Sequence, residues 1–166
     1  DIMIGKPVLD AMNEQINKEL FSSYLYLSMA AYFEDKNLAG FAGWMRNQST
    51  EEREHAMKFY DFILERGGRV MLKAIDTPKT DWKSSLELFE EVAAHEASIT
   101  ASINALYELA LKEKDYPAQV MLQWFISEQV EEEKNAAEIV ANLKLIEDRG
   151  TAVLMLDHRL SKRTAE

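Results

Sequence analysis

The sequence contains no cysteine, and its 166 residues include only three prolines and six glycines. A chain without cysteine forms neither disulfides nor thiolate metal sites, which is typical of proteins that work in a reducing cytoplasm. No stretch approaches the run of about 20 apolar residues that a membrane helix needs. No basic segment followed by an apolar one begins the chain, as in a secretory signal. We therefore expect a cytoplasmic protein with no membrane partner.

Basic residues are also scarce. The chain carries 19 lysines and arginines against 29 aspartates and glutamates, and its formal net charge is −10. This balance disfavours nucleic acid as a partner, because phosphate backbones are bound by clustered lysine and arginine. It suits a surface that attracts cations, although ordinary solubility explains it equally well. With 47% hydrophobic residues, the chain is expected to fold as one domain over residues 1–166.

The few prolines and glycines divide the chain into long segments with helical periodicity. The glycine pair at 67–68 and Gly150 are natural helix stops. Asp115 is a suitable N-cap, and Ser84 and Glu87 have the spacing of a capping box. We predict four helices and a short fifth one, at about residues 7–36, 38–66, 84–114, 115–149 and 151–161.

The lengths of the connections predict how these helices pack. Four helices of about 30 residues are each roughly 45 Å long, and the first and third connections are short enough to give antiparallel pairs. The long connection at 67–83 can cross the length of a bundle and make the second and third helices parallel. This connectivity is that of an all-α, ferritin-like four-helix bundle with one long crossover. A stretch at 69–75 has a hint of strand alternation and can pair with a partner chain.

Each of the four long predicted helices has an apolar stripe at three- and four-residue spacing, with an acidic residue near its middle. No lysine or arginine lies on the four stripes near these acids. The polar side chains at mid-stripe include Glu19 in the first helix, Glu52 and His55 in the second, Glu96 in the third, and Gln129 and Glu132 in the fourth.

Four acids at a similar depth among apolar neighbours need a compensating charge. A carboxylate moved into an apolar core costs several kcal/mol even after relaxation. Tilted helices that carry the acids to solvent are one alternative, and a buried hydrogen-bonded network is another, although no basic residue balances it. A bound metal ion neutralises several carboxylates together.

The types of ligand indicate which metal is bound. Carboxylates with one imidazole and no sulfur suit iron or manganese rather than structural zinc. Di-iron bundles use a Glu from two helices and a Glu-x-x-His motif from each of the other two. Residues 52–55 form such a motif, whereas the fourth helix has Gln129 and Glu132 at the same spacing. One ion thus keeps an imidazole, and we expect the other to bind more weakly.

At these residues the chain resembles a prokaryotic non-haem ferritin over essentially its whole length. Four motifs stand in the order and spacing of that family: MNEQINKELFSSYLYLSMAAYF at 12–33, EEREHAMKFYDF at 51–62, AHEASIT at 94–100 and FISEQVEEEK at 125–134. The resemblance implies a first iron ion held by Glu19, Glu52 and His55. It implies a second held by Glu52, Glu96 and Glu132, with Gln129 close by and Tyr26 beside the centre. It also implies an outer third iron site at Glu51, Glu128, Glu131 and Glu132.

The same resemblance implies iron storage with ferroxidase activity. It implies that two Fe(II) ions at the centre are oxidised to Fe(III) by O2 or peroxide, with an outer site that can take a third. The mineral is stored in a hollow homo-oligomeric shell of 24 chains.

The remaining features concern haem, two histidines and alternative functions. No haem is expected, because Arg53 stands where a bacterioferritin carries its haem-binding methionine. His95 and His158 have no evident partner and are interpreted as surface or packing residues. Two alternatives stay open for the whole protein: a di-metal oxidase or oxygenase component that acts on another substrate, and a structural bundle without metal.

Overall fold

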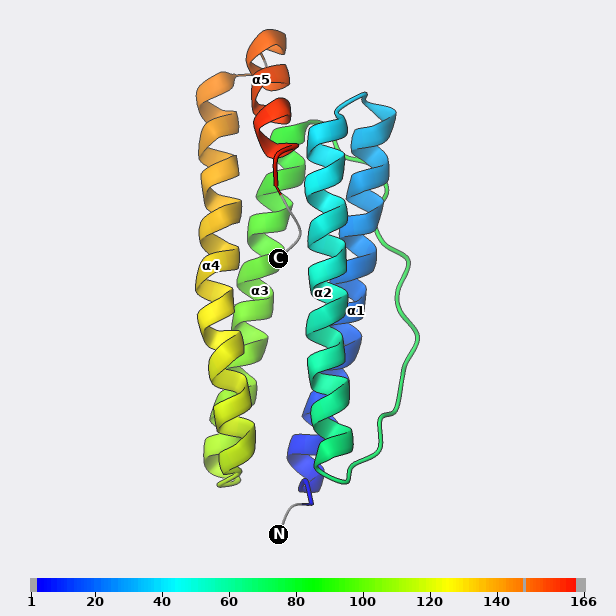
Figure 1. The fold of residues 1–166 in the computed structure, drawn as a ribbon, viewed down its shortest axis with the longest axis vertical. Helices are drawn as coiled ribbons and strands as arrows, with labels where there is room; N and C mark the ends of the chain where they lie inside the picture. Colours follow the sequence, from blue (N-terminus) through cyan, green and yellow to red (C-terminus); the bar gives the residue numbers. More distant parts are fainter. Residues whose placement is uncertain (1–2, 148, 164–166) are drawn as a thin grey trace.

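The structure is a computed structural model that describes residues 3–147 and 149–163. Four long helices form a bundle, and a short fifth helix lies at one end of it (Figure 1). The helices are α1 (Lys6–Asp35), α2 (Ala39–Glu65), α3 (Ser85–Lys112), α4 (Tyr116–Ile146) and α5 (Gly150–Leu160). The predicted bundle with its fifth helix is confirmed. Among the described helices, no apolar stretch is long enough to cross a bilayer.

The four long helices are connected as two antiparallel pairs. α1 packs along α2, and α3 packs along α4. The connection between α2 and α3 runs the length of the bundle and makes these two helices parallel, as predicted (Figure 1). Polar side chains of α1 hold this connection: Asn13 Nδ2 donates to the carbonyl of Arg69 at 3.1 Å, and Ser28 Oγ donates to that of Lys79 at 2.7 Å. Residues 69–75 form no strand within this single chain, so their pairing with a partner chain stays a prediction.

Local sequence explains the starts of α3 and α4. Ser84 Oγ accepts the N–H of Glu87 at 3.1 Å at the start of α3. Asp115 Oδ1 accepts a first-turn N–H at 3.0 Å at the start of α4. Both side chains supply partners that the first turn of a helix lacks. The prediction that Gly150 closes α4 is wrong, because α4 ends with Glu147 in a left-handed conformation (φ 52°) and Gly150 begins α5. Here a glutamate occupies the position that usually favours glycine.

The apolar core consists of two clusters. One surrounds Phe33, Phe41 and Phe89, whose ring centroids lie 5.0 to 5.7 Å apart, near the end that carries α5. The other surrounds Phe59 and Phe125, whose rings stack at 4.3 Å, toward the opposite end of the bundle. Burial of apolar surface in both clusters stabilises the bundle. The two clusters therefore hold the four helices in register on either side of their middle.

A close backbone contact places α5 against the start of α2. Gly40 has no room for a side chain, because a Cβ atom there would lie 1.8 Å from the carbonyl oxygen of Asp157. The side chain of Asp157 accepts the N–H of Phe41 at 2.8 Å. α5 thereby satisfies one of the N–H groups that the first turn of α2 leaves without a partner. Leu156 adds a buried apolar side chain to the nearby core cluster.

Replacement of Gly40 by alanine is expected to displace α5 from α2. A methyl group at 1.8 Å from a backbone oxygen forces the two helices apart, and we expect a loss of roughly 1–3 kcal/mol in the free energy of unfolding. Thermal unfolding measures the loss, and amide hydrogen exchange shows whether it is concentrated in α5. The matched control is Gly43→Ala in the same helix, where nothing lies within 4 Å of the added Cβ atom. That variant should gain about 0.5–1 kcal/mol, and equal stability of the two variants would contradict the contact.

Candidate metal centre

Five side chains from four helices lie together in the middle of the bundle. They are Glu19 of α1, Glu52 and His55 of α2, Glu96 of α3 and Glu132 of α4. None of them is more than 6% exposed. The alternative that tilted helices carry these acids to solvent is therefore wrong. The acids are enclosed between the two apolar clusters.

Three buried atoms of this centre lack a hydrogen-bond partner. Within the part of the chain that the structure describes, Glu19 Oε2, Glu52 Oε2 and His55 Nδ1 make no hydrogen bond. Nδ1 lies 3.3 Å from the Glu52 oxygen and 4.0 Å from the Glu19 oxygen. An unsatisfied buried polar atom costs about 1–3 kcal/mol, and a charged one costs more. The ligand atoms of the three residues lie within 4.8 Å of one another, so a single cation can satisfy all three.

Glu52 belongs to a second group of ligand atoms as well. Its carboxylate lies with those of Glu96 and Glu132, and the ligand atoms of these three residues are again within 4.8 Å of one another. A carboxylate has two oxygens and can contact two ions. Glu52 is therefore positioned between two potential cation sites, one with an imidazole and one with carboxylates alone.

Neutral side chains donate hydrogen bonds to the acids. The Tyr26 hydroxyl donates to Glu96, and Gln129 Nε2 donates to Glu96 Oε2 at 3.2 Å. Gln15 Nε2 donates to Glu19 Oε1 at 3.1 Å. Both Tyr26 and Gln129 thus lie beside the acids, where the sequence resemblance puts them. Gln129 presents its amide nitrogen to the centre and contributes to orienting Glu96.

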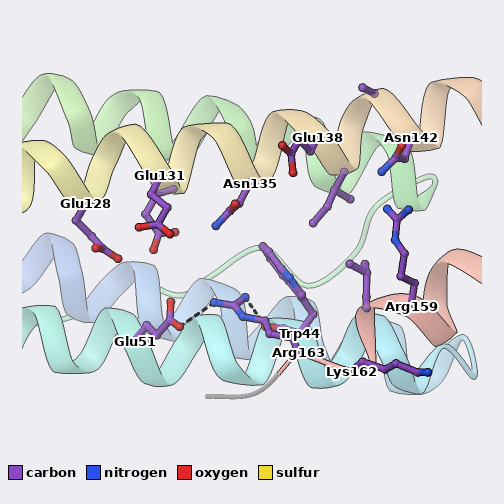
Figure 2. A pocket seen from close by; sticks show the side chains of 14 residues that line it. Trp44, Glu51, Glu128, Glu131, Asn135, Glu138, Asn142, Arg159, Lys162 and Arg163 are labelled. Atoms are coloured by element: carbon purple, nitrogen blue, oxygen red, sulfur yellow. Dashed lines mark hydrogen bonds and ion pairs between the residues drawn. The ribbon is translucent and has the colours of Figure 1, made fainter. Parts of the chain in front are cut away.

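The outer acids line a cavity of about 810 Å³ between α2, α4 and α5 (Figure 2). Glu128 is half-buried, and its ligand atom lies within 4.8 Å of those of His55 and Glu132. Glu131 is exposed, and Glu51 is half-buried and ion-paired. Among the described residues, the structure brings Glu128 to the inner centre but places Glu51 and Glu131 in no common ligand group.

Sequence analysis did not identify two residues that lie next to the acids. Gln48 Nε2 donates to Glu132 Oε2 at 2.5 Å and to Glu52 Oε1 at 3.3 Å. Arg163, beyond α5, donates from Nη1 to Gln48 Oε1 at 3.0 Å and pairs with Glu51 at 2.9 Å. Gln48 had a signal in the sequence, because it continues the inward stripe of α2. Arg163 had none, because it follows the last helix.

The two remaining histidines differ in their surroundings. His95 is half-buried, and its Nε2 atom lies 2.7 Å from Ser22 Oγ. Its ring meets that of Tyr26 edge-on at 5.8 Å between centroids, and burial lowers its pKa. The interpretation of His95 as a packing residue is confirmed, but the expectation that it lacks a partner is wrong. His158 is exposed on α5.

Burial weakens the acidity of the centre. It raises the pKa of Glu19 and Glu52 well above the ordinary value, and the charges of neighbouring carboxylates raise both further. It raises the pKa of Glu96, and it raises that of Glu132 to about 8. With a pKa of about 8, Glu132 holds its proton near neutral pH, which reduces the buried negative charge. A cation that binds to its oxygens must displace that proton.

The fold and the buried cluster define a carboxylate-rich bundle of the ferritin type. Residues 9–146 match the family model for ferritins, described as a ferritin-like domain, and the chain therefore belongs to the ferritin family. It is 43% identical over 161 residues to a bacterial non-heme ferritin of Bacteroides fragilis, covering 97% of this chain and 100% of that one. It is 36% identical to a bacterial non-heme ferritin of Staphylococcus aureus, covering 98% of each.

A solved structure agrees with this assignment. The open pore ferritin from the hyperthermophilic archaeon Archaeoglobus fulgidus superposes with a TM-score of 0.96 at 49% identity, covering 97% of this chain and 99% of that one. The resemblance to prokaryotic non-haem ferritins, inferred from the four motifs, is confirmed.

Cation binding at the centre is expected to release protons. Glu132, with a pKa of about 8, is mostly protonated at pH 7, and binding has to remove that proton. Calorimetric titration of Zn²⁺ in buffers of different ionisation enthalpy should report about one proton or more released per chain. Because protons compete with the cation, the apparent affinity should rise from pH 6 to pH 8.

Two variants control this measurement. Glu132→Gln should release fewer protons than the parent, whereas Glu138→Gln, which alters an exposed residue of the same helix, should match it. Zn²⁺ affinity that is independent of pH would contradict the assignment of protonated buried acids.

Proposed function

We propose that this chain stores iron and oxidises it, as a ferroxidase, at the buried centre. The observation that carries the proposal is the set of unsatisfied atoms on Glu19, Glu52 and His55 beside two further buried carboxylates. Membership of the ferritin family supports the same conclusion. The bacterial relatives are non-heme ferritins, and accordingly we expect no haem in this protein.

Fe(II) is the substrate, and two ions bind at the centre. Glu19, Glu52 and His55 hold the first ion, and Glu52, Glu96 and Glu132 hold the second. The second ion is surrounded by oxygen ligands alone, with Gln129 nearby, and it binds more weakly than the first. Carboxylate oxygens are hard anionic ligands and stabilise Fe(III) relative to Fe(II).

Oxidation needs both ions together. Each Fe(II) gives one electron, so a pair supplies the two electrons that convert O2 to peroxide, or peroxide to water. The hydroxyl of Tyr26 orients Glu96 through its hydrogen bond and is placed to supply a further electron. The protons held by the buried acids leave as Fe(II) binds.

The oxidised iron moves outward from the centre into storage. Glu51, Glu128 and Glu131 line the adjoining cavity and form the outer third site through which ferric iron passes. The mineral accumulates within a homo-oligomeric shell of 24 chains in the cytoplasm, and each chain contributes one domain over residues 1–166. The net charge of −10 favours entry of cations and disfavours nucleic acid and anionic membranes as partners.

One experiment separates this proposal from a di-metal oxygenase component. Fe(II) is titrated anaerobically into the purified protein, air is admitted, and the absorbance of the ferric product is recorded together with particle mass. A shell of 24 chains of 19.1 kDa has a mass of about 460 kDa. We expect such a particle to retain many more than three ferric ions per chain. A monomer or dimer that retains only two ions per chain would favour the oxygenase.

Replacement of Glu52 by glutamine is expected to reduce the rate of Fe(II) oxidation by roughly 100-fold or more, because this residue contacts both ions. The stability of the metal-free protein should stay the same or rise, because a buried acid is replaced by a neutral side chain of the same shape. Stopped-flow absorbance measures the first effect, and thermal unfolding measures the second. Glu54→Gln, which changes an exposed residue of the same helix, should retain the parent rate. Parent-like oxidation by Glu52→Gln would exclude this centre as the ferroxidase site.

A further inference from the structure

We propose that Arg163 is a positioning residue for the ligands of the second iron ion and acts on them through Gln48. It lies in the segment that follows α5, 115 residues along the chain from Gln48. This inference rests on the proposed function in one respect, because it takes Glu52 and Glu132 to be cation ligands.

Three kinds of contact hold the guanidinium group of Arg163. Its Nη2 atom pairs with Glu51 Oε1 at 2.9 Å, in a pair whose side chains are 19% and 15% exposed. Its Nη1 atom donates to the carbonyl of Trp44 at 3.4 Å, and the group stacks over the Trp44 ring at 4.5 Å. Figure 2 shows the Arg163 side chain directed to Glu51, with Trp44 beside it in the lining of the cavity. These contacts fix the position of Nη1, which makes one further hydrogen bond.

Arg163 Nη1 donates this further hydrogen bond to the side-chain oxygen of Gln48 at 3.0 Å. A guanidinium group has only donors, so the atom of Gln48 that faces it must be the oxygen. The amide nitrogen of Gln48 must then face the acids, where it donates to Glu132 at 2.5 Å and to Glu52 at 3.3 Å. Gln48 is only 2% exposed, so bulk solvent has little access to replace these partners. Arg163 therefore selects one of the two orientations of this amide.

The selected orientation matters for one half of the centre. Of the two acids that receive the Gln48 donor, Glu132 accepts the shorter bond and is a proposed ligand of the second ion alone, whereas Glu52 belongs to both halves of the centre. Glu19 and His55 themselves receive no hydrogen bond from Gln48 among the described residues. Loss of second-layer hydrogen bonds of this kind lowers metal affinity by about 10–100-fold. Arg163 should consequently affect the second ion more strongly than the first.

The test is a set of Zn²⁺ titrations by calorimetry on the assembled, metal-free protein. The variant Arg163→Lys keeps the positive charge but has one nitrogen in place of the two by which arginine contacts Gln48 and Glu51 separately. We expect it to weaken the second Zn²⁺ by roughly tenfold, with a smaller effect on the first Zn²⁺ and no change in the melting temperature. The matched control is Arg159→Lys, because Arg159 lines the same cavity with an exposed side chain. It should match the parent.

A double-mutant cycle tests whether the effect passes through Gln48. Gln48→Met removes the amide, and it should weaken the second ion by itself. Arg163→Lys should then add nothing in the Gln48→Met background. An equal loss in both backgrounds, or parent-like affinity in Arg163→Lys, would overturn the inference and leave the proposed function intact. A parent protein that binds no pair of Zn²⁺ ions would overturn both.

Discussion

The burial of several carboxylates in one place is the constraint on which the rest of this structure depends. Isolated charges are unstable in an apolar interior, so the bundle can contain these acids only if other parts of it supply the free energy of folding. Two aromatic clusters, one around Phe33 and one around Phe59, do so from opposite ends. Each acid comes from a different helix, and the centre therefore forms only when all four helices have the correct register. The long crossover along α1 and the contact between Gly40 and α5 both contribute to that register.

Two features lower the free-energy cost of burying the acids and also prepare them to bind cations. Burial raises the pKa values of the acids, that of Glu132 to about 8, so that Glu132 keeps a proton near neutral pH and the negative charge falls without loss of a ligand atom. Neutral donors, the hydroxyl of Tyr26 and the amides of Gln129 and Gln48, hold other oxygens in fixed directions. A proton leaves easily in exchange for a metal ion, whereas a lysine in the same place would compete with it permanently. This difference explains why the inner acids have hydroxyl and amide donors rather than ion-paired basic residues among the described parts of the chain.

The sequence was sufficient for the features that depend on local spacing. Helical periodicity predicts which face of each helix is buried, and so it places Glu19, Glu52, Glu96 and Glu132 at one depth without knowledge of the packing. Glycine at 67, with φ 73°, ends α2 as the rule for helix stops requires. The prediction fails where the determining contact is distant or the local rule has an exception. Arg163 reaches Gln48 only because α5 folds back against α2, and no periodic pattern encodes that return. The end of α4 was misplaced because a glutamate takes the left-handed conformation there.

The two halves of the centre differ in how their geometry is determined, and this difference follows from the sequence of α4. A second Glu-x-x-His motif would have a histidine at position 132 and a rigid imidazole whose direction is set by its own helix. Glutamate is there instead, and Gln129 donates to Glu96, so the second half of the centre consists of flexible carboxylates that require outside support. Gln48 provides that support from α2, and Arg163 determines which way Gln48 faces. The half with His55 depends less on such an arrangement, since the Glu-x-x-His spacing within one helix already positions two of its three ligands. Support from the end of the chain is thus found on the side where the helix itself does not supply an imidazole.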